Sequence, residues 1–260
     1  MRSIRVRWFA VAAAALMAAA FVAPATAGAK TPPTSTAHLQ GTYQAAAVHG
    51  GLTPSVSTSA YGGGYFVYPG TFTGDVASAS AVFTAPAISC ASGTDLEWLL
   101  PGIWVYQAGV ITQQVDVNLN CNSGVLYTQA IICLSTGSCD STLTINAGDR
   151  VLLSFYEGAN SMYGSVRDFT TGQVATVTAA APATHDDTVL IGDAGPGQFG
   201  FATKVPTFST LTFAKAEVNG YYISDQTSAR YNLVSTHRVQ ISTGLLTDRG
   251  DRFVTRFVHN

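Results

Sequence analysis

The chain has 260 residues, of which 47% are hydrophobic and only 11% are charged, with 13 Lys and Arg against 15 Asp and Glu. A mildly acidic chain without a basic stripe is a poor candidate for nucleic-acid binding, so we expect no nucleic-acid partner. With so few charges, the surface must consist largely of Ser, Thr, Gly, Asn and Gln. Such a surface changes its charge little with pH, which suits an acidic exterior.

The first residues have the features of an export signal. Three arginines precede an apolar run from Trp8 to about Val22, and Ala25-Thr26-Ala27 follows. A basic start, a short apolar stretch and a small-x-small site are typical of a cleaved secretory signal over residues 1–27. The alternative is an uncleaved anchor, but the run is shorter than the ~20 residues that span a bilayer. We therefore expect a secreted, extracellular protein with 10 basic against 15 acidic residues, a net charge of −5.

Behind the signal, residues 28–45 are rich in Pro, Thr, Ser and Ala, which predicts an N-terminal arm or linker. Residues 46–260 are enough for a single β-sandwich domain. Short runs rich in Val, Thr, Phe, Tyr and Ile alternate there with Gly, Asn, Asp and Ser, a pattern typical of an antiparallel sandwich or barrel. We predict strands over residues 65–68, 79–84, 104–107, 115–119, 125–133, 142–145, 151–156, 164–168, 174–178, 188–191, 210–214, 221–224, 239–242 and 253–258.

All four cysteines lie in one part of the chain, between Cys90 and Cys139. An even count in an exported protein predicts two disulfides, for which three pairings exist. We favour Cys133–Cys139, which closes a short loop, and Cys90–Cys121. A zinc site is the alternative, but the cysteines lack paired C-x-x-C spacing and nearby histidines.

Several short segments carry a resemblance to a known family. The central one is Tyr-Gln-Ala-Gly-Val over residues 106–110, and others lie, in chain order, at 83–86, 102–103, 147–149, 169–173 and 208–213. In this order and spacing they resemble the secreted glutamic peptidases, or eqolisins, over about residues 75–220. The resemblance implies an all-β fold, an antiparallel β-sandwich of the concanavalin-like jelly-roll type. It also implies an acid endopeptidase whose dyad is one glutamine and one glutamate.

The resemblance assigns the family's glutamine to Gln107, because the family places it in a strand segment of the form Gln-Ala/Thr-Gly-Val. Its amide would stabilise the oxyanion, and the glutamate would activate a water. A preorganised neutral donor helps where negative charge develops, and a paired carboxylate is a suitable general base. Judged without the resemblance, a strand glutamine is more often structural and donates to a neighbouring carbonyl.

The family's glutamate has no counterpart at the expected place. Its position falls on Thr188 or Val189, depending on a one-residue shift of register, and neither side chain is a base. Asp187 and Asp193 flank it, and Asp193 corresponds to the family's second glutamate. Because a one-residue slip turns a strand side chain to the opposite face, Asp187 could substitute only in a remodelled strand.

Two further segments depart from the family. Its Trp-x-Gly-Ile-Asp-Gly is Leu-Pro-Gly-Ile-Trp-Val here (residues 100–105), and the aromatic and acidic residues of its cleft strand are largely aliphatic in residues 127–134. Three losses around one cleft indicate relaxed catalysis. The sequence thus resembles a divergent, bacterial-type secreted glutamic peptidase without its catalytic glutamate.

Two functional hypotheses follow from this resemblance. In the first, the protein is a catalytically degenerate peptidase-like pseudoenzyme that binds an extended polypeptide or a glycan in a concave groove lined by Trp104, Tyr106 and Tyr127. In the second, it is an active acid endopeptidase that uses Gln107 with Asp187 or Asp193. A third and weaker alternative is an unrelated β-sandwich enzyme such as a glycosidase, which would need two inward carboxylates about 5–10 Å apart.

A metal site is the remaining chemical alternative. His185, Asp186, Asp187 and Asp193 could hold a cation, but three polar residues in a loop are more often solvated, and calcium would need more oxygen ligands. We therefore expect no metal and no cofactor. We also expect a monomer without a membrane anchor once the signal is removed.

Overall fold

The computed structural model describes residues 56–60, 62–69, 75–93, 96–134, 138–182, 187–194, 204–235 and 238–259. All of them belong to one compact unit. The predicted signal (1–27) and arm (28–45) lie outside the described residues and stay predictions. No helix among the described residues is long and apolar enough to cross a membrane.

The described residues are almost entirely β-structure. Their elements are β1 (Ser57–Ser59), β2 (Gly62–Tyr68), β3 (Ser78–Thr84), β4 (Ile88–Ser89), β5 (Leu96–Gln107), β6 (Val110–Asn122), β7 (Val125–Leu134), β8 (Ser138–Asp140), β9 (Arg150–Glu157), β10 (Ser161–Asp168), β11 (Val174–Ala180), β12 (Thr188–Ala194), β13 (Thr207–Phe208), β14 (Leu211–Val218), β15 (Tyr221–Tyr222), the 3₁₀ helix η3 (Ile223–Asp225), β16 (Thr227–Ser235), β17 (Arg238–Thr243), the 3₁₀ helix η4 (Asp248–Gly250) and β18 (Phe253–Phe257).

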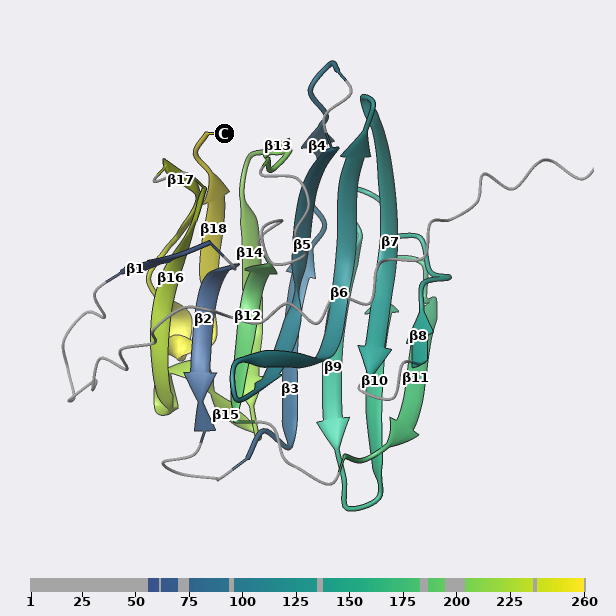
Figure 1. Cartoon of the computed structure of the whole chain (residues 1–260), viewed down its shortest axis with the longest axis vertical. Coiled ribbons are helices and arrows are strands. Elements are labelled where there is room, and N and C mark those ends of the chain that lie inside the picture. Colours follow the sequence, from purple (N-terminus) through teal and green to yellow (C-terminus); the bar gives the residue numbers. More distant parts are fainter. Residues whose placement is uncertain are drawn as a thin grey trace, which may run out of the picture. The chain divides into compact units, whose positions relative to one another are not determined.

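The main sheet folds back on itself. Its strand order is β11-β10-β9-β3-β14-β18-β17-β16-β2-β12-β5-β6-β7-β8, with antiparallel neighbours along this path. Strands from the first half contact strands from the second, since β10 packs against β7 and β9 packs against β5 and β6. Most strands run along the long axis of the view in Figure 1. The fold is therefore an all-β, antiparallel β-sandwich, as predicted.

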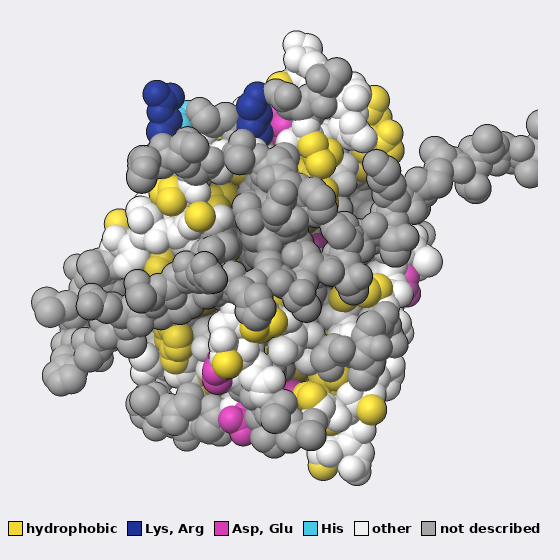
Figure 2. Space-filling model, in the orientation of Figure 1, with side chains coloured by type: hydrophobic (Ala, Val, Ile, Leu, Met, Phe, Trp, Pro, Cys, Tyr) yellow, Lys and Arg dark blue, Asp and Glu magenta, His cyan; other side chains and the backbone are white. Residues whose placement is uncertain are grey.

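One hydrophobic core fills the space between the two halves. It is built from alternate residues of each strand, because successive strand side chains point to opposite faces. Members from both halves include Ile103, Val105, Leu153, Phe155 and Phe213. Each fully buried side chain of this size contributes about 1.5–3 kcal/mol. Charged side chains are sparse on the surface seen in Figure 2, as the composition predicts.

Most predicted strands are present and extend further than predicted, but residues 142–145 do not form a strand. The backbone N–H of Thr142 donates to the side chain of Asp140, and that of Asn146 donates to the side chain of Asp149. Leu143 is nevertheless buried in the core. The N–H of Ala130 in β7 donates to the carbonyl oxygen of Leu143, so the alternating apolar pattern here indicated a buried segment alongside β7 and not a regular strand.

The region after β14 also differs from the prediction. The strand predicted over residues 221–224 is limited to β15 and continues as η3, while β16 was not predicted at all. β16 pairs with both β2 and β17, so it joins the two halves of the sandwich. Its sequence does carry the expected alternation, since Ala229, Tyr231 and Leu233 alternate with Arg230 and Asn232, so this strand could have been found from the sequence.

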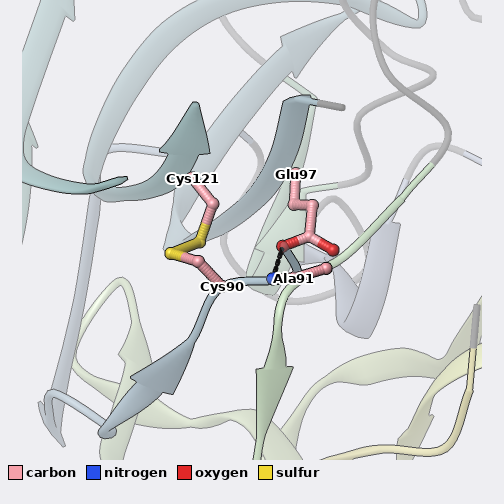
Figure 3. The surroundings of a disulfide bond; sticks show 4 residues. All are labelled: Cys90, Ala91, Glu97 and Cys121. Carbon is pink, nitrogen blue, oxygen red and sulfur yellow. Dashed lines mark hydrogen bonds between the residues drawn. A yellow bond between two sulfur atoms is a disulfide. The ribbon is translucent and has the colours of Figure 1, made fainter. Parts of the chain in front are cut away.

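Both predicted disulfides are confirmed. Cys133 and Cys139 lie directly opposite each other on β7 and β8, and they are bonded. Cys90, which follows β4, is bonded to Cys121 of β6. Figure 3 shows the buried carboxylate of Glu97 beside this second bond, where its Oε2 accepts a 3.0 Å hydrogen bond from the backbone N–H of Ala91.

Candidate functional site

The half-sheet of β2, β12, β5, β6 and β7 has two different faces. One joins the main core, and the other carries a separate cluster of large apolar side chains. We call this second face the aromatic face. Its cluster consists of Phe66, Leu100, Trp104, Tyr106, Leu190, Ala194 and Tyr231.

A row of polar side chains on β6 shares the aromatic face. Val115, Val117 and Leu119 point into the main core, so the alternate residues point the other way. This row consists of Gln114, Asp116, Asn118 and Asn120. Its register places Gln114 opposite Trp104 of β5, and Asp116 opposite Gly102 of the same strand.

Gln114 and Asp116 form the closest polar pair of this row. Nε2 of Gln114 donates to Oδ2 of Asp116 at 2.6 Å, and Oδ1 of Asp116 has no hydrogen-bond partner among the described residues. Burial raises the pKa of Asp116 well above its usual value, and the hydrogen bond from Gln114 lowers it only in part. A carboxyl group with a raised pKa can retain its proton and serve as an acid.

A glycine makes room for this pair. A Cβ atom on Gly102 would lie 2.5 Å from Cβ of Asp116 and 2.8 Å from Nε1 of Trp104. Any larger residue at position 102 would therefore clash with both Asp116 and Trp104.

Gln107 occupies a different place. It is the last residue of β5 and pairs with Val110 across a two-residue turn. Ala108 and Gly109 in that turn have φ angles of 48° and 80°, which is the geometry of a type I′ hairpin. Alternation along β5 places Gln107 on the side of Val105, which faces the main core, and not on the side of Trp104.

Asp187 lies at the same hairpin. Its Oδ2 accepts a 3.0 Å hydrogen bond from the backbone N–H of Ala108, and its own N–H donates to the carbonyl oxygen of Tyr106 at 2.9 Å. The structure thus brings Asp187 next to the turn that follows Gln107. The carboxylate is exposed and caps that turn.

Asp193 lies on the core side of β12. Its neighbours at alternate positions, Val189 and Ile191, belong to the main core. Burial raises the pKa of Asp193 to about 7, and the nearby hydroxyl of Thr255 lowers it in part. No hydrogen bond of ordinary geometry joins the two side chains, and neither carboxylate oxygen has another partner among the described residues.

All residues of β12 are described, and the strand presents no carboxylate to the aromatic face. Leu190 belongs to the cluster on that face, so Thr188 and Gly192 point to the same side by alternation. Thr188 is opposite Tyr106, and Gly192 is opposite Gly102. Gln107, Asp187 and Asp193 are therefore not gathered on the face that carries the aromatic cluster.

The three predicted binding residues share the aromatic face but differ in exposure. Trp104 and Tyr106 are buried within the cluster, where Tyr106 packs against Phe66 with ring centroids 5.8 Å apart. Tyr127 of β7 is 53% exposed and lies opposite Asn120 of β6. Only Tyr127 of the three offers an open surface.

Sequence reasoning missed the row that begins with Gln114. Residues 113–120 read Gln-Gln-Val-Asp-Val-Asn-Leu-Asn, in which polar and apolar residues alternate from Gln114 onward. This period of two predicts a strand with one polar face. The pattern was sufficient to find Asp116 as a carboxyl group on the face opposite the core.

Among the described residues there is no group of three or more His, Cys, Asp and Glu side chains that could hold a metal ion. His185 and Asp186 of the predicted metal cluster lie outside the described residues. The expectation that the protein binds no metal stays a prediction.

Solved structures of glutamic peptidases have the same fold. Scytalido-glutamic peptidase, solved with a transition state analog inhibitor, aligns with a TM-score of 0.57 and 15% identity, over 77% of this chain and 98% of the other. SCP-B, a member of the eqolisin family in a complex with the tripeptide Ala-Ile-His, aligns with a TM-score of 0.54, 15% identity and the same coverage. No protein-family model and no curated protein sequence matches the chain. The chain therefore has the jelly-roll β-sandwich fold of the glutamic peptidases.

Proposed function

We propose that this protein is a secreted, catalytically degenerate relative of the glutamic peptidases that binds an extended polypeptide on its aromatic face. The observation that carries the proposal is the composition of β12. It presents Thr188, Leu190 and Gly192 to that face, and none of these is a general base. A general base must reach the water that it activates, directly or through one other water.

Neither of the two carboxylates that the sequence suggested as a general base, Asp187 and Asp193, is directed to the aromatic face. Asp193 points into the main core, and Asp187 caps the β5–β6 turn. A capping carboxylate can still exchange its partner for solvent, but its side chain is directed to the backbone N–H of Ala108. The burial of Asp193 and the hydrogen bond of Asp187 keep both carboxylates away from a substrate on the aromatic face.

The polar row next to the aromatic cluster supports binding. Asn118 of β6 is opposite Gln129 of β7, and Asn120 is opposite Tyr127. Amide side chains both donate and accept, so they suit the N–H and C=O groups of an extended chain. Oδ1 of Asn118 has no hydrogen-bond partner among the described residues. SCP-B, which has the same fold, was solved with a bound tripeptide.

Secretion is part of the proposal. The predicted signal and the two disulfides both favour an oxidising, extracellular location, because such bonds are rare in the cytosol. A glycan is the alternative ligand for the same face, since the amide row and Tyr127 would also suit sugar hydroxyls.

The first experiment is proteolysis of a denatured protein substrate by the secreted protein between pH 2 and 7. We expect no cleavage. The same preparation should bind unstructured peptides, and a double Asn118→Ala, Gln129→Ala variant should bind them about tenfold more weakly. Cleavage that disappears in the Gln107→Ala variant would overturn the proposal, and binding of oligosaccharides alone would change the ligand class to glycans.

A second candidate function rests on the Gln114–Asp116 pair. We also consider an acid endopeptidase in which Asp116 supplies the carboxyl group and Gln114 supplies the amide. The hydrogen bond between them and the raised pKa of Asp116 favour this candidate. Cleavage that is lost in Asp116→Asn and Gln114→Ala but retained in Gln107→Ala would establish it.

A further inference from the structure

The other half of the sandwich also has an outward face, formed by β3, β9, β10 and β11. Val151, Leu153 and Phe155 of β9 point into the main core, so the alternate residues of β9 point outward. The same reasoning applies to β10, where Met162 and Val166 point inward. We call this surface the tyrosine face, and it lies on the half of the sandwich that does not carry the aromatic face.

Two exposed tyrosines lie side by side on the tyrosine face. Tyr156 of β9 is directly opposite Tyr163 of β10, and their side chains are 57% and 39% exposed. Neighbouring strands are about 4.8 Å apart, so the two side chains leave the sheet next to each other. Ser78 and Thr178 extend the row on either side.

The next row consists of short hydroxyl side chains. Ser154 is opposite both Ser80 and Ser165, and Ser165 is opposite Thr176. This row lies two residues along the strands from the tyrosines, about 7 Å away. Ser165 is buried, so Ser80, Ser154 and Thr176 supply the accessible hydroxyl groups between the tyrosines and the far end of the strands.

Two arginines lie at that far end. The guanidinium carbons of Arg150 and Arg167 are each 5.3 Å from the ring centroid of Phe169, which is 43% exposed. Such cation–π contacts hold a guanidinium group in place while its N–H groups stay available. Arg167 is four residues from Tyr163, so the two ends of the face are about 13 Å apart.

The tyrosine face carries no compensating negative charge within β3, β9, β10 and β11, which are described in full. Glu157 lies on the core side together with Phe155 and is buried. Asp168 is buried too, and its oxygens accept hydrogen bonds from Thr170 and Thr171. Asp75 precedes β3, and Glu217 of the neighbouring strand β14 lies opposite Ser80, at the edge of the hydroxyl row, together with Lys215. The positive charge of this face is therefore confined to the end that carries Arg150 and Arg167, on a protein whose overall charge is negative.

We propose that the tyrosine face binds an anionic polysaccharide. Tyr156 and Tyr163 stack against sugar rings, the hydroxyl row bonds to sugar hydroxyls, and Arg150 and Arg167 pair with the carboxylates of uronic acid units. Exposed aromatic rings on a sheet face favour a ring-shaped ligand over an acidic peptide, and arginine suits planar carboxylates. The proposal does not depend on the proposed function, because the two faces belong to different halves of the sandwich.

The test is affinity electrophoresis of the full chain through gels that contain polygalacturonate, neutral dextran or polyglutamate. We expect retardation by polygalacturonate alone. The Tyr156→Ala, Tyr163→Ala double variant and the Arg167→Gln variant should each bind about tenfold more weakly. Matched controls are Tyr221→Ala and Arg256→Gln, which remove an exposed tyrosine and an exposed arginine outside this face and should bind normally. Thermal melts would establish that every variant is folded.

Three outcomes would overturn the proposal. One is the absence of retardation by polygalacturonate. Another is equal retardation by polyglutamate, which would indicate an acidic polymer of any kind. The third is retardation that weakens in Arg256→Gln as much as in Arg167→Gln, which would indicate diffuse charge attraction without a site.

Discussion

Nε2 of Gln114 lies 2.6 Å from Oδ2 of Asp116, two residues further along β6, and no other hydrogen-bond partner among the described residues reaches this carboxyl group. The pair is a neutral amide beside a carboxyl group whose pKa is raised by burial. It lies on the aromatic face at the level of Trp104 and Gly102. This arrangement has consequences for stability whether or not the pair acts on a substrate.

We expect the Asp116→Asn variant to be more stable than the wild type at pH 7. The raised pKa means that the folded state holds the proton more tightly than the unfolded state, so wild-type stability falls as pH rises above the unfolded value of about 3.9. Asparagine resembles the protonated acid and does not ionise. Urea unfolding at pH 4 and pH 7 would measure the difference, which should be small at pH 4.

A matched control for this variant is Gln114→Leu, which removes the amide and leaves Asp116 without its donor. It should be less stable than the wild type by about 1–3 kcal/mol, because a buried acceptor loses its partner. Equal stability of Asp116→Asn and wild type at both pH values would contradict the raised pKa.

Asp193 predicts a second and separate pH dependence. Its pKa is raised to about 7 by burial, so the folded state binds more protons than the unfolded state between about pH 4 and pH 7. Stability should therefore fall across this window by roughly 4 kcal/mol at most. The Asp193→Asn variant should show a flatter profile, and thermal melts at half-unit pH intervals would test it. A wild-type profile that rises toward pH 7 would contradict this expectation.

Asp116 and Asp193 add to what the composition of the chain predicted about its stability at low pH. The low charge content predicted tolerance of an acidic exterior, and the structure adds two buried acids that favour folding at low pH. The sequence could not show this, because burial of Asp193 depends on which face of β12 it occupies. That face follows from register, and a shift by one residue reverses it.

The strands and the disulfides could be predicted from the sequence more completely than the candidate site. Cys133 and Cys139 could be paired because a short loop separates them, and most strands could be found from their alternation. Gln107 shows where such reasoning fails. The predicted strand over residues 104–107 ends at the correct residue, but the face to which Gln107 points follows from the alternation along β5 and not from the local motif.

Gly102 provides a test of the packing beneath Trp104. The Gly102→Ala variant places a Cβ atom 2.5 Å from Cβ of Asp116 and 2.8 Å from Nε1 of Trp104. Such overpacking costs about 1–3 kcal/mol, so the midpoint of urea unfolding should fall. Gly158→Ala is the control, because its nearest neighbour is the flexible side chain of Tyr156 at 3.3 Å. Equal midpoints for the two variants would show that the strands separate easily at Gly102.

The two disulfides should differ in their effect on stability. Cys90–Cys121 spans 31 residues and Cys133–Cys139 spans 6. In the chain-entropy model, loops of these lengths correspond to about 4 and about 2 kcal/mol. The double Cys90→Ala, Cys121→Ala variant should therefore unfold at a lower urea concentration than the double Cys133→Ala, Cys139→Ala variant. The reverse order would mean that the short loop between β7 and β8 holds native contacts of its own.

Loss of the longer bond should also release the N–H of Ala91 from Glu97, because the bond fixes the segment that carries this donor. Hydrogen exchange at Ala91 would follow that release directly.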